Sequence, residues 1–178
     1  MKFFINFLTI FRLFSGPIIF AMLLLTFNPM TAFILFIIAS LSDYFDGYLA
    51  RKYFLESTFG EVLDPIADKI LTLFLLLTLM LHFQSPFIGM VGGVILAREF
   101  WVSALRDLNA RKSNLNATKV TFLAKVKTSS QFLTFATFLF GILINNSLII
   151  FLSNILLFFA MILSLKTALN YTQATFQD

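Results

Sequence analysis

The sequence contains no cysteine, which excludes disulfide bonds, thiolate catalysis and thiolate metal sites. Charged residues are also scarce: they make up 12% of the 178 residues, while hydrophobic residues make up 59%. A chain with so few polar groups cannot cover a water-facing globule, and its mean hydropathy of +0.91 indicates lipid as the solvent for much of its surface. The net charge of +4 is small, so we expect a membrane and no nucleic acid as the partner.

Long apolar stretches fill most of the chain. A helix that crosses the hydrocarbon core needs roughly 20 apolar residues, so the length leaves room for about six spans. We expect an all-α membrane protein, one domain over residues 1–178, with six transmembrane helices at about Phe7–Phe27, Thr31–Tyr53, Phe59–His82, Phe87–Leu108, Phe122–Ile144 and Leu148–Tyr171. Asn28-Pro29 and Ser85-Pro86 each pair a capping side chain with a proline suited to the first helical position. Arg12 interrupts the first stretch and Pro17 follows, which favours a retained span over a signal peptide.

Lysine and arginine are distributed unevenly between the two ends of these spans. With six spans, one side of the membrane receives both termini and the connections after the second and fourth spans. Six basic residues fall in or beside those segments: Lys2, Arg51, Lys52, Arg111, Lys112 and Lys119. The three connections on the opposite side contain no lysine or arginine. By the positive-inside rule, we expect both termini and the active site on the cytoplasmic side of an inner membrane, or on the matrix side in an organelle.

Four of the six aspartates gather at this charged side. The second span ends in a stripe of acidic and small residues, Asp43, Asp46, Gly47 and Ala50. The third span begins with a stripe at four-residue spacing, Gly60, Asp64 and Asp68. Because a short connection joins the two spans, we expect them to be antiparallel neighbours with both stripes at the same membrane depth.

Four clustered carboxylates in a membrane need counter-charges. Each charge within a span costs roughly 2.5–3.5 kcal/mol on insertion scales, and like charges repel one another as well. Two divalent cations would balance the four charges, and ligation by aspartate oxygens favours Mg²⁺ or Mn²⁺ over zinc. Two such ions about 3.5–4 Å apart are a recurring arrangement for displacement at phosphorus. Arg51 adds a cation for phosphate oxygens, and Gly47 and Gly60 allow a ligand close to the backbone.

The spacing of these residues resembles a family signature. The pattern Asp43-x₂-Asp46-Gly47-x₂-Ala50-Arg51-x₈-Gly60-x₃-Asp64-x₃-Asp68 is similar to that of the CDP-alcohol phosphatidyltransferases at all eight fixed positions. The resemblance implies metal ligation by all four aspartates, with Asp68 also the general base on the acceptor hydroxyl. It implies a homodimer and a CDP-diacylglycerol site formed by Asn6, Thr9, Asp46, Gly47, Ala50, Arg51 and Gly60.

Shorter motifs resemble the members of that family that make phosphatidylglycerophosphate. They are Asn6-x₂-Thr9-x₂-Arg12, Ala97-Arg98-Glu99, Ser103-Ala104-Leu105-Arg106 and Lys125-Val126-Lys127-Thr128, although Ile5 stands where a proline is usual. The resemblance implies in-line transfer from CDP-diacylglycerol to sn-glycerol 3-phosphate with release of CMP. A phosphate on the acceptor needs cations, and we expect it to bind Arg98, Arg106, Lys125 and Lys127. The two lysines are two positions apart, so on a regular helix only one of them faces the ligand.

Other assignments are compatible with the same residues. Another acceptor would make the chain a cardiolipin, phosphatidylserine or phosphatidylinositol-phosphate synthase. Outside the enzymes, intramembrane aspartates also mark ion-coupled transporters, and a scaffold could bind divalent cations without catalysis. A transporter should hold its charges near the bilayer midplane, whereas these aspartates lie at one end of their helices. His82 lies at the end of the third span away from the aspartates, so we expect an interfacial residue there.

Overall fold

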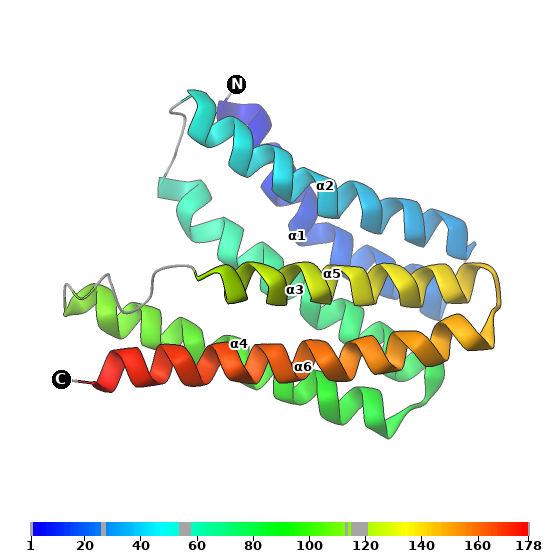
Figure 1. Ribbon diagram of the computed structural model, residues 1–178. Helices are drawn as coiled ribbons and strands as arrows, with labels where there is room; N and C mark the ends of the chain where they lie inside the picture. Colours follow the sequence, from blue (N-terminus) through cyan, green and yellow to red (C-terminus); the bar gives the residue numbers. More distant parts are fainter. Residues whose placement is uncertain (1, 26–27, 54–57, 113, 115–120, 178) are drawn as a thin grey trace.

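The described residues form six helices that run back and forth along one axis (Figure 1). The computed structural model describes residues 2–25, 28–53, 58–112, 114 and 121–177, with the backbone alone described at residues 2–5, 43–44, 46–53, 58–59 and 61. The helices are α1 Lys2–Leu24, α2 Pro29–Tyr53, α3 Thr58–Phe83, α4 Pro86–Arg111, α5 Phe122–Leu143 and α6 Ser147–Phe176. No strand occurs in the described residues, which confirms the all-α prediction.

Local sequence determines where several helices begin. Ser85 is the N-cap of α4, and its hydroxyl accepts a hydrogen bond from the backbone N–H of Ile88 (3.4 Å). Asn146 is the N-cap of α6, and its side-chain oxygen accepts a hydrogen bond from the backbone N–H of Leu148 (3.0 Å). At the start of α2, Asn28 Oδ1 accepts a hydrogen bond from the backbone N–H of Met30 (2.9 Å). The helix breaks predicted from the capping side chains before α2 and α4 are therefore confirmed.

The six helices close into a ring in which each packs mainly against two others. The order around the ring is α1, α2, α5, α6, α4, α3 and back to α1. The α1 and α3 backbones approach closely at Gly16, where an added Cβ atom would lie 3.0 Å from the Cα of Leu71. In lipid, such close packing contributes more to helix association than the hydrophobic effect does. The close fit of α1 on α3 fixes the position of the first helix beside the aspartates.

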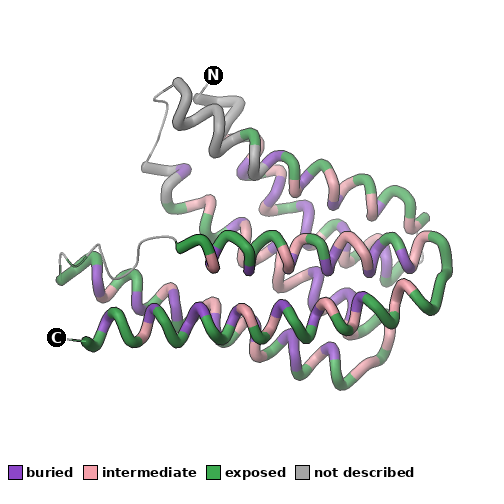
Figure 2. Tube along the Cα trace, in the orientation of Figure 1, coloured by how far each residue is buried: buried purple, intermediate pink, exposed green. Residues whose placement is uncertain are grey.

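The outer surface of the ring is apolar. Buried and exposed residues alternate along the helices, as expected when one face of each helix packs inward (Figure 2). Large apolar side chains such as Phe14, Phe151 and Leu169 are exposed. Within the described residues, the five helices other than α2 are long and apolar enough to cross a membrane, and α2 contributes the shorter apolar segment Pro29–Ser42. These properties indicate a multi-pass membrane protein, whereas six spans and the cytoplasmic termini stay predictions.

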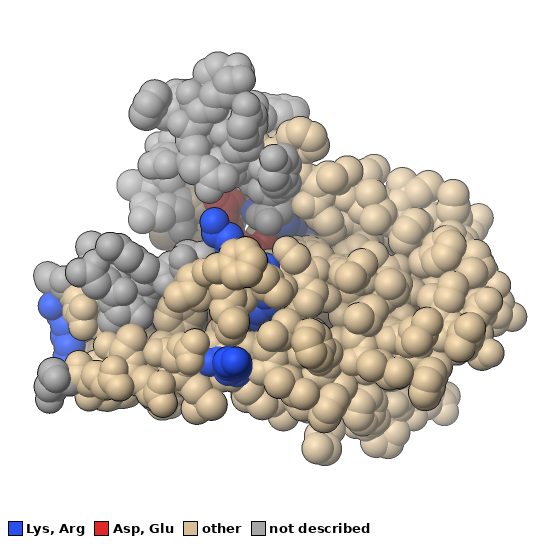
Figure 3. All heavy atoms as spheres, viewed as in Figure 1, with Lys and Arg blue, Asp and Glu red and all other residues tan. Residues whose placement is uncertain are grey.

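Charged side chains gather at one end of the ring. The helices alternate in direction, so the start of α1 and the ends of α2, α4 and α6 share that end (Figure 1). On the face shown in Figure 3, the Lys, Arg, Asp and Glu atoms of the described residues lie in the same half of the molecule, and the other half is tan. The candidate site therefore lies between helices at this charged end.

Candidate active site

Two aspartates of α3 contact two polar residues of α1. Asp64 and Asp68 are four residues apart, so they project from the same face of α3 on successive turns. Thr9 Oγ1 donates a hydrogen bond to Asp64 Oδ1 (2.8 Å), and Arg12 Nη2 donates to the same oxygen (3.1 Å). Arg12 Nε lies 3.3 Å from Asp68 Oδ1. One guanidinium therefore bridges both carboxylates.

Burial explains why Arg12 and the aspartates occur together. The Arg12 side chain is fully buried, whereas the side chains of Asp64 and Asp68 are 44% and 46% exposed. A buried cation needs opposite charges nearby, and these two acids provide them. The partial exposure of both carboxylates leaves them accessible to a bound ligand or ion. Thr9, which the family resemblance assigns to the donor site, is buried against Asp64.

The predicted metal ligands fall into two groups. Five residues of the predicted metal and donor sites lie in the last turns of α2, where the structure describes the backbone alone. They are Asp43, Asp46, Gly47, Ala50 and Arg51. Asp64 and Asp68 are described, and the part of the chain with described side chains contains no group of three or more His, Cys, Asp or Glu residues suited to a metal ion. Two adjacent carboxylates supply the oxygen ligands that Mg²⁺ and Mn²⁺ prefer, so this half of the set fits those ions. The complete metal site stays a prediction.

A cavity of about 430 Å³ lies beside Asp68, between α3, α4, α5 and α6. Among the residues with described side chains, its charged lining consists of Asp68, Lys69, Arg98, Glu99, Arg106 and Lys127. Four of these residues are basic and two are acidic, so the cavity has an excess of positive charge that favours an anionic ligand. Phe132 and Phe135 of α5 add an apolar part to the lining. The volume is within the range of sites for small molecules.

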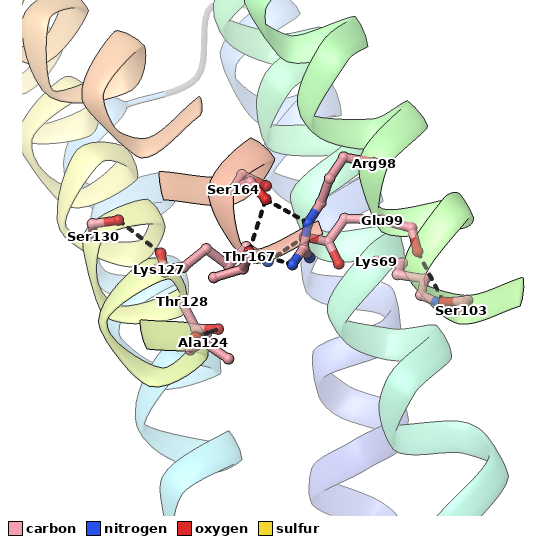
Figure 4. A network of polar contacts seen from close by, with 10 residues as sticks. All are labelled: Lys69, Arg98, Glu99, Ser103, Ala124, Lys127, Thr128, Ser130, Ser164 and Thr167. Atoms are coloured by element: carbon pink, nitrogen blue, oxygen red, sulfur yellow. Dashed lines mark hydrogen bonds and ion pairs between the residues drawn. The ribbon is translucent and has the colours of Figure 1, made fainter. Parts of the chain in front are cut away.

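Glu99 of α4 links two of the cations. Its Oε1 accepts hydrogen bonds from Lys127 Nζ of α5 and from Arg98 Nη1 (3.2 Å). Arg98 also donates from Nε to the backbone carbonyl of Ser164 (2.8 Å) and from Nη2 to Thr167 Oγ1, both on α6 (Figure 4). Arg98 and Lys127 are both buried. These contacts hold their charged groups in the cavity wall and connect three helices around it.

Two further basic residues complete the lining. Lys69 Nζ donates a hydrogen bond to Ser103 Oγ, and the Ser103 hydroxyl donates to the backbone carbonyl of Glu99 (2.9 Å). Arg106 is exposed, and its Cζ atom lies 5.7 Å from the centroid of the Tyr171 ring, in the range of a cation–π contact. Arg106 therefore remains accessible at the cavity, whereas the guanidinium of Arg98 is tied to α6.

Three of the four residues predicted to bind the acceptor line this cavity: Arg98, Arg106 and Lys127. The fourth, Lys125, is exposed and does not belong to the lining. α5 is helical from Phe122, and a step of two residues on a helix turns the side chain by about 200°. The structure thus places Lys127 at the cavity and Lys125 outside it. Contact of any of these residues with a substrate stays a prediction.

Several residues of the described site carry no predicted role, among them Arg12, Lys69, Glu99 and Gln131. Arg12 follows Thr9 by three residues and Gln131 follows Lys127 by four, so each shares a helix face with a residue of the predicted site. That spacing was the signal available in the sequence. Glu99 directly follows Arg98, and adjacent residues on a helix point about 100° apart, so no pattern indicated that the two side chains meet. Two donor-site predictions lie nearby, since Asn6 precedes Thr9 by three residues on α1 and Gly60 precedes Asp64 by four residues on α3.

Comparison with known proteins identifies the family of this chain. The family model of CDP-alcohol phosphatidyltransferase matches residues 4–166. The CDP-diacylglycerol–glycerol-3-phosphate 3-phosphatidyltransferase of Escherichia coli (strain K12) is 32% identical over 173 residues, which cover 96% of this chain and 93% of that enzyme. The enzyme of the same name from Salmonella choleraesuis (strain SC-B67) is 33% identical with the same coverage. The chain belongs to the CDP-alcohol phosphatidyltransferase family.

Proposed function

We propose that the chain transfers the phosphatidyl group of CDP-diacylglycerol to sn-glycerol 3-phosphate, which yields phosphatidylglycerophosphate and CMP. The observation that supports this most is the position of Asp68, which contacts Arg12 beside Asp64 and also lines the basic cavity. A carboxylate there can take a proton from an acceptor in the cavity while the donor diphosphate lies on its other side. The relatives described above are named for this reaction.

The cavity suits a small anionic acceptor. Arg106 and Lys127 supply cations that can form charge-assisted hydrogen bonds with a phosphate group. Arg98 strengthens the positive field, although its contacts with α6 assign it mainly to the cavity wall. A volume of about 430 Å³ accommodates glycerol 3-phosphate, whereas a lipid acceptor such as phosphatidylglycerol would leave most of its atoms outside. These features favour a small phosphate over phosphatidylglycerol or serine, and the names of the relatives favour glycerol 3-phosphate over inositol phosphate.

The reaction is a single displacement at phosphorus. The primary hydroxyl oxygen of the acceptor attacks the phosphorus that carries diacylglycerol, and Asp68 takes the hydroxyl proton. A new P–O bond forms as the bond between that phosphorus and the bridging oxygen of the diphosphate breaks. CMP leaves with the bridging oxygen and its electron pair, and Asp68 then releases its proton to water. The basic lining holds the acceptor so that its hydroxyl meets the donor in line.

The donor site lies on the other side of Asp68. We assign two Mg²⁺ or Mn²⁺ ions to Asp43, Asp46, Asp64 and Asp68, and such ions, when bound, supply positive charge for the diphosphate. Thr9 and Arg12 orient Asp64 through the two hydrogen bonds to its Oδ1 atom. We assign CDP-diacylglycerol binding to residues of α1, α2 and α3, namely Asn6, Thr9, Asp46, Gly47, Ala50, Arg51 and Gly60.

The membrane arrangement is part of the proposal. We infer that residues 1–178 form one domain with six spans, since α2 has 25 residues and is long enough to cross a bilayer. The gathering of charges at one end of the ring supports cytoplasmic termini and an active site on the cytoplasmic side of an inner membrane. The lipid donor would reach this site by diffusion in that membrane. We also propose that the protein forms a homodimer, as the family resemblance implies.

A reconstituted assay tests the proposed reaction. Purified protein in detergent micelles receives CDP-diacylglycerol, glycerol 3-phosphate and Mg²⁺, and both products are quantified by chromatography and mass spectrometry. We expect CMP and phosphatidylglycerophosphate in equal amounts, and neither when one substrate is omitted. Release of CMP without a new lipid would indicate hydrolysis and would contradict the transfer.

A further inference from the structure

Gln131 is a buried polar residue of the cavity whose amide nitrogen has no hydrogen-bond partner. The residue lies on α5, lines the cavity and is 6% exposed. Its Nε2 atom is buried and, among the described residues, no acceptor lies within hydrogen-bond distance of it. Burying an amide without a hydrogen bond is unfavourable, so buried amides in folded proteins almost always have partners. An N–H donor in the wall of a ligand-sized cavity indicates that the ligand provides the partner.

The position of Gln131 indicates which part of a ligand it meets. Gln131 follows Lys127 by four residues, so both side chains project from the same face of α5, about 6 Å apart along the helix axis. Because α5 begins at the charged end of the ring, Gln131 lies deeper between the helices than Lys127 does. Its neighbours in the lining include Phe132 and Phe135. The guanidinium of Arg98, which also lines the cavity, is held by Glu99, Ser164 and Thr167. The cavity thus combines cations nearer the charged end with a neutral donor and aromatic rings further in.

The two parts of the cavity favour different groups of a ligand. An anionic group gains most near Lys127 and Arg106, where charge-assisted hydrogen bonds are available. A neutral hydroxyl oxygen suits the deeper part, because an uncharged N–H donor beside phenylalanine rings compensates poorly for the desolvation of a phosphate. The attacking hydroxyl belongs next to Asp68 on α3. The middle carbon of glycerol 3-phosphate carries one further hydroxyl, which neither the cations nor Asp68 need to bind. This secondary hydroxyl is the group available to Gln131.

We propose that Gln131 determines acceptor specificity by donating a hydrogen bond from Nε2 to the secondary hydroxyl oxygen of the acceptor. The inference rests on the proposed function and adds the part of the acceptor that is recognised. A site with a buried donor favours acceptors that carry this hydroxyl, because an acceptor that lacks it leaves the amide without a partner. The residue would thereby select a polyol phosphate over a simple alkanol phosphate.

The test compares two acceptors in one preparation. The analogue 3-hydroxypropyl phosphate keeps the phosphate and the attacking primary hydroxyl of glycerol 3-phosphate and lacks only the secondary hydroxyl. We expect the wild-type protein to prefer glycerol 3-phosphate by about tenfold in kcat/KM, the effect typical of one buried hydrogen bond. Gln131→Met replaces the amide by an unbranched apolar side chain of similar length. In this variant kcat/KM for glycerol 3-phosphate should fall by about tenfold and that for the analogue should stay nearly unchanged, so the preference disappears.

The controls separate the possible outcomes. Gln173→Met, at an exposed position of α6 outside the cavity lining, should keep the wild-type preference. Because the preference is a ratio within one preparation, a smaller folded fraction does not alter it, and Gln131→Leu provides a second variant if Gln131→Met does not fold. An unchanged preference for glycerol 3-phosphate in the Gln131 variants would overturn the inference. If kcat/KM also falls equally for both acceptors, Gln131 contacts the phosphate or has a packing role. Failure of the wild-type protein to use glycerol 3-phosphate would instead refute the proposed function and, with it, this inference.

Discussion

Lys127 on α5 donates a hydrogen bond from Nζ to Glu99 Oε1 on α4, across the cavity. These two helices are not main neighbours in the ring, because α4 packs against α3 and α6 whereas α5 packs against α2 and α6. The ion pair therefore connects the α4 and α5 walls of the cavity, which are both packed on α6. A phosphate that enters the cavity meets an ammonium group whose position Glu99 already fixes, so less ordering is needed on binding.

The first prediction separates the two lysines of α5. Lys127→Ala should reduce kcat/KM for glycerol 3-phosphate by about ten- to hundredfold, because a charge-assisted hydrogen bond to phosphate is worth roughly 1.5–3 kcal/mol. Lys125→Ala is the matched control and should change kcat/KM by less than about twofold, since the exposed Lys125 does not line the cavity. The KM for CDP-diacylglycerol should change little in both variants. Equal losses in steady-state kinetics would contradict the assignment of Lys127.

The second prediction concerns the thermal stability of a Glu99 variant. Glu99→Gln keeps the shape of the side chain but leaves two buried cations, Arg98 and Lys127, without their shared carboxylate. Leaving a buried charge unpaired costs on the order of 3 kcal/mol, so the variant should melt at a clearly lower temperature in detergent. The control is Asp107→Asn, which removes the exposed pair between Asp107 and Arg111 (2.8 Å) and should leave the melting temperature nearly unchanged. A Glu99→Gln protein as stable as the wild type would show that the pairing does not stabilise the fold.

Long apolar stretches and capping side chains predicted the helices, because both are local features of the sequence. The start of α4 lies one residue from the prediction, since Ser85 and Pro86 specify a cap and a first turn by themselves. The positions of Asp64 and Asp68 on one face of α3 also follow from spacing alone.

The remaining features of the site depend on how the helices pack. Arg12 and Asp64 are 52 residues apart in sequence, so no local sequence pattern predicts their hydrogen bond. The choice between Lys125 and Lys127 depends on the rotation of α5 about its axis relative to the cavity, which packing against α2 and α6 determines.

The third prediction concerns the metal ions and Arg12. Chelation should abolish transfer by the wild-type protein, and Mg²⁺ or Mn²⁺ should restore it, because the clustered aspartates need counter-charges to hold a diphosphate. Arg12→Met removes the cation between Asp64 and Asp68, so the two carboxylates depend more strongly on a bound ion. The variant should therefore gain a larger increase in melting temperature from Mg²⁺ than the wild type does. Full activity in the chelator would exclude the two-metal site, and equal thermal shifts would exclude this role for Arg12.

The fourth prediction separates the base from the metal ligands. Asp68→Asn should reduce turnover by at least about a hundredfold, because an amide cannot accept the proton of the acceptor hydroxyl. CDP-diacylglycerol should still bind, which can be measured by titration in detergent with Mg²⁺ present. Asp64→Asn should weaken donor binding as well as turnover, since an amide lacks the negative charge with which Asp64 would hold a metal ion beside the diphosphate. Near-normal turnover by Asp68→Asn would remove the assignment of Asp68 as base.

The central claim is that the basic cavity beside Asp68 binds the phosphate of glycerol 3-phosphate. An acceptor panel tests it most directly: CMP release is measured at saturating CDP-diacylglycerol with glycerol 3-phosphate, inositol phosphate, serine or phosphatidylglycerol as the only acceptor. Glycerol 3-phosphate should support the fastest release, and Arg106→Ala should lower kcat/KM for this acceptor by about ten- to hundredfold. Efficient transfer to another acceptor with glycerol 3-phosphate inert, or an Arg106→Ala protein with unchanged kinetics, would contradict the claim.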